Sequence, residues 1–182
     1  ARYPRISIEL FLNDAHANIV EAAIGIGLLL DLPNDGNLVT RTLLRSQRVT
    51  VVSPQYLERH APIRRPEALL QHDCARLVRG RRVFDRWLYR EGGQLREIRV
   101  GGTLLSNNAE VVHQWALAGR AVAYKALWDV ESDLRAGRLV RPLQAFECDQ
   151  INLYAVYASR AHLPQRMRLF LDFIAEKLQA GT

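Results

Sequence analysis

The chain has 182 residues, 48% of them hydrophobic and 24% charged, which is the composition of an ordinary soluble globular protein. Its longest apolar run, at 26–30, is far too short for a helix that spans a bilayer. The net charge of +6 comes from 25 lysines and arginines spread among 19 acids. Because the densest cluster, at 76–82, lacks interleaved aromatic residues, we interpret the basic residues as a solvated surface rather than a nucleic-acid interface.

In the first third of the chain, apolar periodicity predicts strands that alternate with helices. The strands are expected over 6–12, 24–30 and 48–52, and the helices over 15–25 and 54–60. The middle strand is apolar on both faces, which is typical of a parallel sheet. Ser53 and Pro54 suit the N-cap and the first position of the second helix.

From Cys74 onward, short strands joined by glycine turns predict a small antiparallel element. These strands lie within 74–80, 86–93 and 94–102. The alternation then returns, with strands over 121–127 and 151–158 and helices over 128–137 and 164–178. The order of elements predicts an α/β fold with mainly parallel sheets, arranged as two lobes.

The stretch Ser106-Asn107-Asn108 joins an apolar strand to an apolar helix. A helix begins with unpaired amide N–H groups and a partial positive charge, and such ends bind carboxylates and phosphates in α/β folds. Asn107 as N-cap with Glu110 as its partner would instead form a capping box that satisfies these amides. The residues alone leave both interpretations open. Ser106 and Asn108 are the better candidates for direct ligand contact, because Asn107 is the expected cap.

Three further residues are candidates for contact with a small molecule. Tyr124 and Lys125 end an apolar strand, and we expect both to point into the same cleft. Lys125 is either a counter-charge for an acidic ligand or a side chain that reaches along the surface to solvent, and the second interpretation is slightly favoured. Asp31 lies on a loop near the expected cleft.

Catalytic and metal-binding motifs are missing from the sequence. It contains no Gly-x-Ser-x-Gly elbow, Walker loop or HExxH motif. The five histidines show no ligand-like pairing, and Cys74 and Cys148 lack metal-type spacing. We therefore expect no enzyme activity, no metal, no cofactor and two reduced thiols.

In their order and spacing, several stretches resemble the effector-binding domain of LysR-type transcriptional regulators, in the branch that includes CrgA- and DmlR-like proteins. The stretches that carry the resemblance are 1–10, 48–60, 66–74, 106–143 and 153–178. They cover nearly the whole chain, and the fourth is the most specific.

The resemblance implies two Rossmann-like lobes joined by two crossing strands, as in type 2 periplasmic-binding proteins, with the first strand of lobe I missing. Lobe I, which also dimerises, is expected to be 1–53 plus 158–182, and lobe II 54–157. An effector would bind between the lobes of a cytoplasmic homodimer or homotetramer. DNA would be bound only through an N-terminal winged helix-turn-helix that this chain does not contain, and no membrane partner is expected.

One departure from the family lies at 25–31, where the family usually has an Asp-x-Ala-x-Arg-x-Gly strand. Gly25, Leu29 and Asp31 stand at the Asp, Arg and Gly positions, so the role of that arginine does not carry over. A carboxylate metabolite is the expected effector. The alternative function is a solute-binding protein of a transport system with the same fold, which a secretory leader upstream of Ala1 would reveal.

Overall fold

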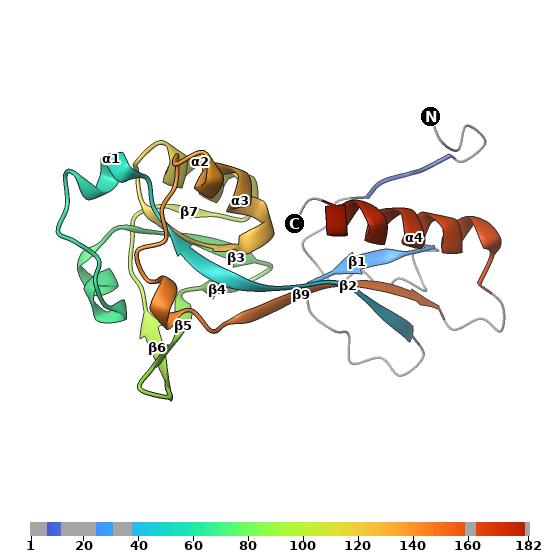
Figure 1. Cartoon of the computed structure of the whole chain (residues 1–182), viewed down its shortest axis with the longest axis horizontal. Helices are drawn as coiled ribbons and strands as arrows, with labels where there is room; N and C mark the ends of the chain where they lie inside the picture. The colour runs from blue at the N-terminus through green and yellow to red at the C-terminus, as the bar shows by residue number, and fades with distance from the viewer. Residues whose placement is uncertain (1–6, 12–24, 31–37, 159–162, 181–182) are drawn as a thin grey trace. The chain divides into compact units, whose positions relative to one another are not determined.

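A computed structural model of the chain describes residues 7–11, 25–30, 38–158 and 163–180 (Figure 1). The chain forms two compact units, of which unit 1 combines Ala1–Arg45 with Asn152–Thr182 and unit 2 is Ser46–Ile151. Two strands, β2 (Leu38–Val51) and β9 (Gln150–Ala158), each run from one unit into the other. The assignment of dimerisation and effector binding to these units remains a prediction.

Unit 2 contains the C-terminal end of β2 and a mixed set of helices and strands. In chain order these are α1 (Pro54–Leu57), the 3-10 helix η1 (Pro66–Gln71), β3 (Cys74–Arg79), β4 (Arg82–Phe84), β5 (Arg86–Glu91), β6 (Gln94–Arg99), β7 (Leu105–Ser106), α2 (Ala109–Leu117), β8 (Val122–Ala126), α3 (Leu127–Arg135) and the 3-10 helix η2 (Gln144–Phe146).

The main sheet of unit 2 has the order β2-β8-β3-β4, with β7 paired to β3. Strand β3 is parallel to both β7 and β8, but β8 is antiparallel to β2 and β4 is antiparallel to β3. The sheet is therefore mixed, and the prediction of mainly parallel sheets is wrong. Strands β3 and β4 are joined by a tight turn, which permits only antiparallel pairing. Helix α2 connects β7 to β8, and this longer connection allows both strands to run parallel to β3.

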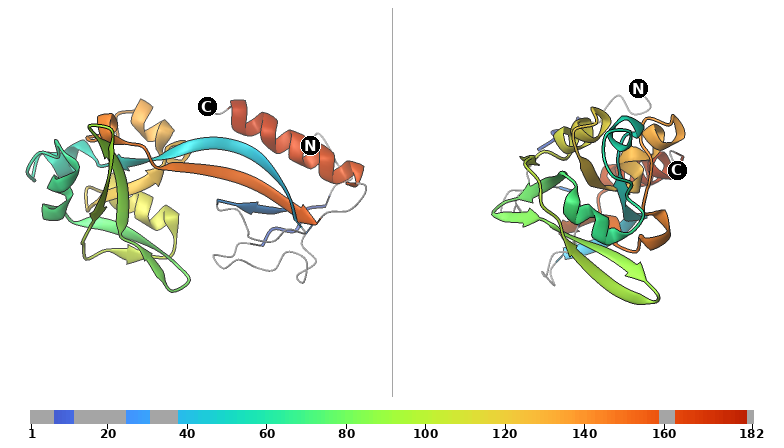
Figure 2. Two further views of the ribbon diagram at one scale, coloured as in Figure 1. Left: turned by 90° about the horizontal axis from the view of Figure 1, so that it is seen from below. Right: turned by 90° about the vertical axis from the view of Figure 1, so that its left-hand side faces the viewer.

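Strands β5 and β6 form a separate antiparallel hairpin, which the right-hand view of Figure 2 shows apart from the main sheet. The prediction is confirmed for these two strands but is wrong for the strand at 74–80, because this segment is β3 of the main sheet and is parallel to β7 and β8. The inward-facing Trp87 and Tyr89 of the hairpin are buried in a cluster with Tyr56 of α1 and Leu69 of η1. This cluster also includes Val122 of β8, so the hairpin covers one face of the main sheet.

Helices α2 and α3 contribute to a second cluster, on the other face of the main sheet. Val112 and Ala116 of α2 and Val130 of α3 pack there with Ala123 of β8. Successive strand residues point to opposite faces, which is why Val122 and Ala123 belong to different clusters. Unit 2 thus has three layers, with the sheet between the hairpin and the two helices.

The start of α1 matches its sequence signals. Ser53 is the N-cap, its Oγ accepts the Tyr56 N–H at 3.2 Å, and Pro54 occupies the first turn. The helix ends at Leu57 rather than at His60 as predicted. Pro62 follows five residues after Leu57, and its missing N–H cannot extend a helical ladder.

Unit 1 contains β1 (Gly27–Leu29), which pairs with β9, and α4 (Gln165–Ala180). Leu171 of α4 is buried against Leu43 of β2 and Ala155 of β9. The pairing of β1 is antiparallel and Leu28 is exposed, so the prediction of a parallel strand covered on both faces is wrong. A run of apolar residues shows that a segment can be buried but does not specify the direction of its partner.

The predicted strand over 6–12 is also wrong in its described part. Residues 7–11 make no strand pairing, and Ile8 and Leu10 are 62% and 75% exposed. Alternating apolar residues stabilise a strand only where a neighbouring strand and an apolar layer receive them. The predicted helix over 15–25 lies almost wholly outside the described residues.

Two expectations about chemistry can be compared with the structure. Both cysteines carry free thiols, as predicted. Within the described ranges, no helix is long and apolar enough to cross a membrane.

Candidate functional site

The beginnings of α2 and α3 lie at one edge of the main sheet in unit 2, which we call the α2–α3 edge. Strands β7 and β8 are both parallel to β3, so their carboxyl ends point the same way. Helix α2 begins shortly after Ser106, the last residue of β7, and α3 begins directly after Ala126, the last residue of β8. Ligands of open α/β sheets bind at such carboxyl ends, where helix N-termini offer amide groups.

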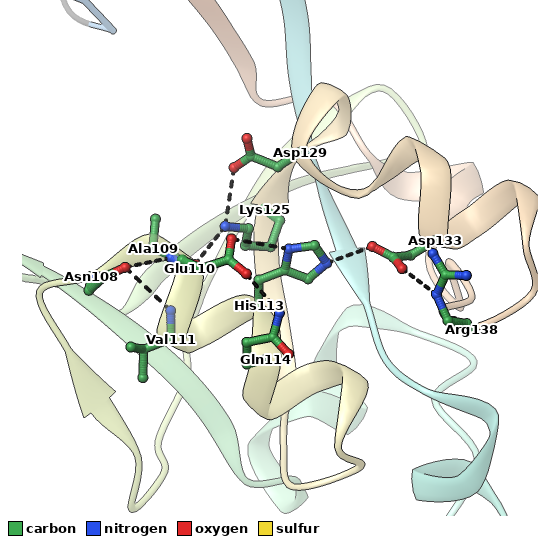
Figure 3. A network of polar contacts seen from close by, with 10 residues as sticks. All are labelled: Asn108, Ala109, Glu110, Val111, His113, Gln114, Lys125, Asp129, Asp133 and Arg138. Atoms are coloured by element: carbon green, nitrogen blue, oxygen red, sulfur yellow. Dashed lines mark hydrogen bonds and ion pairs between the residues drawn. The ribbon is translucent and has the colours of Figure 1, made fainter.

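The N-cap of α2 is Asn108. Its Oδ1 accepts the N–H groups of Glu110 at 2.8 Å and Val111 at 3.4 Å (Figure 3). The predicted capping box of Asn107 and Glu110 is therefore wrong by one residue. Glu110 is the second residue of the helix, and its Oε1 accepts a hydrogen bond from Gln114 Nε2 at 2.7 Å. The Oδ1 atom of Asn108 is used by the cap, whereas its side-chain NH2 group donates to no other described residue, so ligand contact by Asn108 remains a prediction.

The two residues before Asn108 keep hydrogen-bonding capacity. Ser106 Oγ accepts the Asn108 N–H at 3.1 Å, which leaves its hydroxyl hydrogen to donate elsewhere. Asn107 is exposed, and among the described residues its side chain has no hydrogen-bond partner. The cap also leaves the Ala109 N–H unused, because Asn108 accepts only from the next two amides. Hence Ser106, Asn107 and the side-chain NH2 group of Asn108 present free donors at the α2–α3 edge.

Lys125 is buried at this edge and connects the two helices. Only 5% of the residue is exposed, and Nζ donates to the carbonyl oxygen of Ala109 at 2.8 Å. The same nitrogen lies 3.1 Å from Asp129 Oδ2 in the first turn of α3. The favoured prediction that Lys125 reaches along the surface is wrong, and its charge is already balanced by Asp129 (Figure 3).

Tyr124 lies on the opposite face of the sheet from Lys125. Its hydroxyl donates to the Leu88 carbonyl at 3.0 Å, and its ring stacks on Trp87 with centroids 5.0 Å apart. Burial raises the pKa of Tyr124 far above its ordinary value, so the hydroxyl stays a neutral donor. The prediction that Tyr124 and Lys125 point into the same cleft is wrong, because adjacent strand residues alternate between faces.

A buried network also joins α2 to α3. His113 Nε2 lies 2.9 Å from Asp133 Oδ2, and Asp133 Oδ1 accepts from Arg138 Nε at 2.6 Å (Figure 3). Glu110 Oε2 lies 3.8 Å from His113 Nδ1 on the solvent side. No sequence motif pairs His113 with Asp133, and sequence reasoning missed this support of the edge.

The remaining sequence predictions concern Asp31 and metal ions. Asp31 lies outside the described residues. In the part of the chain that the structure describes, no group of three or more His, Cys, Asp and Glu residues could hold a metal.

The comparisons with known proteins accord with this architecture. The family model of the LysR substrate binding domain matches residues 1–179. The chain belongs to the LysR substrate-binding domain family. The HTH-type transcriptional activator TtdR of Escherichia coli O6:K15:H31 (strain 536 / UPEC) is 26% identical to this LysR domain over 173 residues, covering 95% of this chain and 56% of the relative. The HTH-type transcriptional regulator PtxR of Pseudomonas aeruginosa is 28% identical over 177 residues, covering 97% and 56%. The chain thus spans just over half the length of these relatives.

A solved structure supports the same conclusion. The regulatory domain of CrgA from Neisseria meningitidis, a LysR-type transcriptional regulator, matches with a TM-score of 0.86 at 25% identity, covering 97% of this chain and 86% of that one. The LysR domain therefore has the α/β fold of type 2 periplasmic-binding proteins, and the fold class and family implied by the sequence resemblance are confirmed.

Replacing Asn108 by alanine in the LysR domain is expected to lower the free energy of unfolding by about 1 kcal/mol, because two helix amides lose their acceptor. Asn107→Ala, one residue earlier, is the matched control and should change stability by less than about 0.5 kcal/mol. Urea unfolding monitored by circular dichroism measures both. Equal losses would show that the cap is not restricted to Asn108.

Proposed function

We propose that the chain is the effector-sensing part of a longer LysR-type transcription regulator. Relatives named as HTH-type activators and regulators extend well beyond the matched region, since the chain covers 56% of their length. In this proposal a winged helix-turn-helix outside the chain binds DNA. The full protein acts in the cytoplasm as a homodimer or homotetramer. The domain itself catalyses no reaction. The translated gene upstream of Ala1 tests this directly. A helix-turn-helix there supports the proposal, and a secretory leader contradicts it.

We place the effector at the α2–α3 edge of unit 2. The observation that carries this is the set of unused donors at the start of α2: the Ser106 hydroxyl, the Asn107 amide and the Ala109 N–H. A helix N-terminus stabilises a nearby anion by about 0.3–1 kcal/mol even at an exposed position. A carboxylate metabolite fits these donors, and Asp31 remains a predicted contact.

Lys125 and Asn108 act in this proposal as positioning residues. Lys125 holds the carbonyl of the first helical residue, and Asn108 caps the two amides that follow it. Because the ammonium group of Lys125 is paired with Asp129, it is not a free cation for the effector. The edge therefore suits one carboxylate that accepts several hydrogen bonds. A signal arises if the effector binds one conformation of the regulator more tightly than another.

Isothermal titration of the 182-residue chain with a panel of carboxylate metabolites tests the site. For an effector that binds, Ser106→Ala and Asn107→Ala should each lower the affinity about tenfold, the effect of losing one hydrogen bond to a charged group. Ser132→Ala, at an exposed position on α3, is the control and should leave the affinity unchanged.

Unchanged affinity in both edge variants would rule out the α2–α3 edge as the binding site. The upstream gene sequence bears separately on the regulator assignment, so the two proposals can fail independently. Lys125→Met is unsuitable as a test of contact, because it removes a buried structural charge together with any effect on the ligand.

A further inference from the structure

A basic groove lies in unit 2, on the face of the sheet covered by the β5–β6 hairpin. Its volume is about 500 Å³, within the usual range for small-molecule sites. The residues that form it come from the loop before η1, from η1 itself and from the two hairpin strands, and include Pro62, Arg64, Arg65, Ala68, Glu91 and Arg96. None of these belongs to the α2–α3 edge.

One ion pair links the two walls of the groove. Arg65, directly before η1, donates from Nε at 3.2 Å and from Nη2 at 2.5 Å to Oε1 of Glu91, the last residue of β5. This ion pair joins the loop to the hairpin, and Glu91 neutralises the charge of Arg65. Because Arg65 is mostly exposed, the pair links the two walls only weakly.

Two other arginines of the groove, Arg64 and Arg96, have side chains that are available for contact with a ligand. Arg64 and Arg96 are exposed, and neither side chain has a hydrogen bond or ion pair with another described residue. They extend from different walls, Arg64 from the loop and Arg96 from β6. Glu67 also lines the groove without an ion pair among the described residues, so the unpaired charges are two positive and one negative.

We infer that this groove is a second binding site, for a compact oxyanion that carries at least two negative charges. A guanidinium group presents its donors in a planar fork that matches a carboxylate or a phosphate in two-point contact. An anion with two such groups offers Arg64 and Arg96 a two-point contact each and balances both charges, whereas a monoanion must share its oxygens and its single charge between them. Pro62 and Ala68 provide apolar surface for the carbon skeleton of an organic anion.

Isothermal titration of the chain with citrate and, separately, with pyrophosphate tests the site, with acetate as the singly charged comparison. We expect at least one of the two polyanions to bind more tightly than acetate, and which of them binds distinguishes a carboxylate ligand from a phosphate ligand. The double variant Arg64→Gln/Arg96→Gln should lower that affinity at least about tenfold. Glu67→Gln, which removes the unpaired negative charge, should raise it.

The matched control is Arg81→Gln/Arg82→Gln at the exposed β3–β4 turn, which removes the same net charge elsewhere. It should change the affinity less than about twofold, because neither residue lines the groove and moderate salt weakens interactions between exposed charges that are not in contact. Equal losses in both double variants, or no binding of either polyanion to the unmodified chain, would overturn the inference. Neither Arg64 nor Arg96 belongs to the α2–α3 edge, so the result for their double variant is separate from success or failure at that edge.

Discussion

Glu147→Gln is expected to lower the free energy of unfolding by about 3 kcal/mol, because it breaks a buried ion pair and disturbs a backbone hydrogen bond. The Glu147 side chain has 0% exposure, and its partner Arg141 has 18%. Oε2 accepts from both Nε and Nη2 of Arg141, and Oε1 accepts the Thr50 N–H of β2 at 3.0 Å. The glutamine NH2 group would face one of these donors and leave it buried without an acceptor.

Chemical denaturation of the purified variant measures this loss. The control is Glu97→Gln in the ion pair with Arg86, whose side chains are 62% exposed for the arginine and 45% for the glutamate. Exposed pairs of this kind contribute up to about 1 kcal/mol, so the control should remain close to the unmodified chain. If both variants lost the same small amount of stability, the Glu147 pair would not be buried in solution.

Trp87→Ala is expected to destabilise the chain by about 3–5 kcal/mol, the usual range for removing a large aromatic side chain from a core. Trp87 is 2% exposed, stacks on Tyr124 and donates from Nε1 to the Phe84 carbonyl at 3.4 Å. The loss removes the stacking of Trp87 on Tyr124 and leaves the hairpin held to the sheet by Tyr89, which hydrogen-bonds Thr50. Amide hydrogen exchange of β5 and β6 should therefore become faster than that of β8.

Leu95→Ala provides the comparison on the same hairpin. Leu95 is 63% exposed, so its truncation should change the free energy of unfolding by less than about 0.5 kcal/mol. A Trp87→Ala variant as stable as Leu95→Ala would mean that the hairpin does not pack on the sheet. Thermal and urea unfolding together decide between these results.

Local signals in the sequence predicted much of unit 2. The Ser53-Pro54 cap, the buried strand that precedes it and the β5–β6 hairpin all depend on neighbouring residues, and each is present, although the strand begins at Leu38 rather than at the predicted residue 48. The position of the α2 cap was missed by one residue, because Asn107 and Asn108 are equally good caps by residue type. The direction of β1 depends on its pairing with β9, which is remote in sequence and leaves no local trace.

At the α2–α3 edge, too, some features follow from local sequence and others depend on how distant segments pack. That Tyr124 and Lys125 face opposite sides follows from strand alternation and could have been predicted. The pairing of Lys125 with Asp129 could not, because Lys125 lies in β8 and Asp129 in α3, so helical i,i+4 spacing does not apply. The contact of His113 with Asp133 could not, because it depends on how α2 and α3 pack. The free donors of Ser106 and Asn107 became apparent only once the cap had been located.

The division of the chain between its units also orders events during synthesis. Ser46–Ile151 is one uninterrupted segment, whereas the other unit needs residues from both sides of it. The ribosome therefore synthesises all of unit 2 before it completes unit 1. Domains generally fold as units once their whole chain is available, so unit 2 can fold first. Strand β1 is translated early but pairs with β9, so it has to wait for a partner made more than 100 residues later.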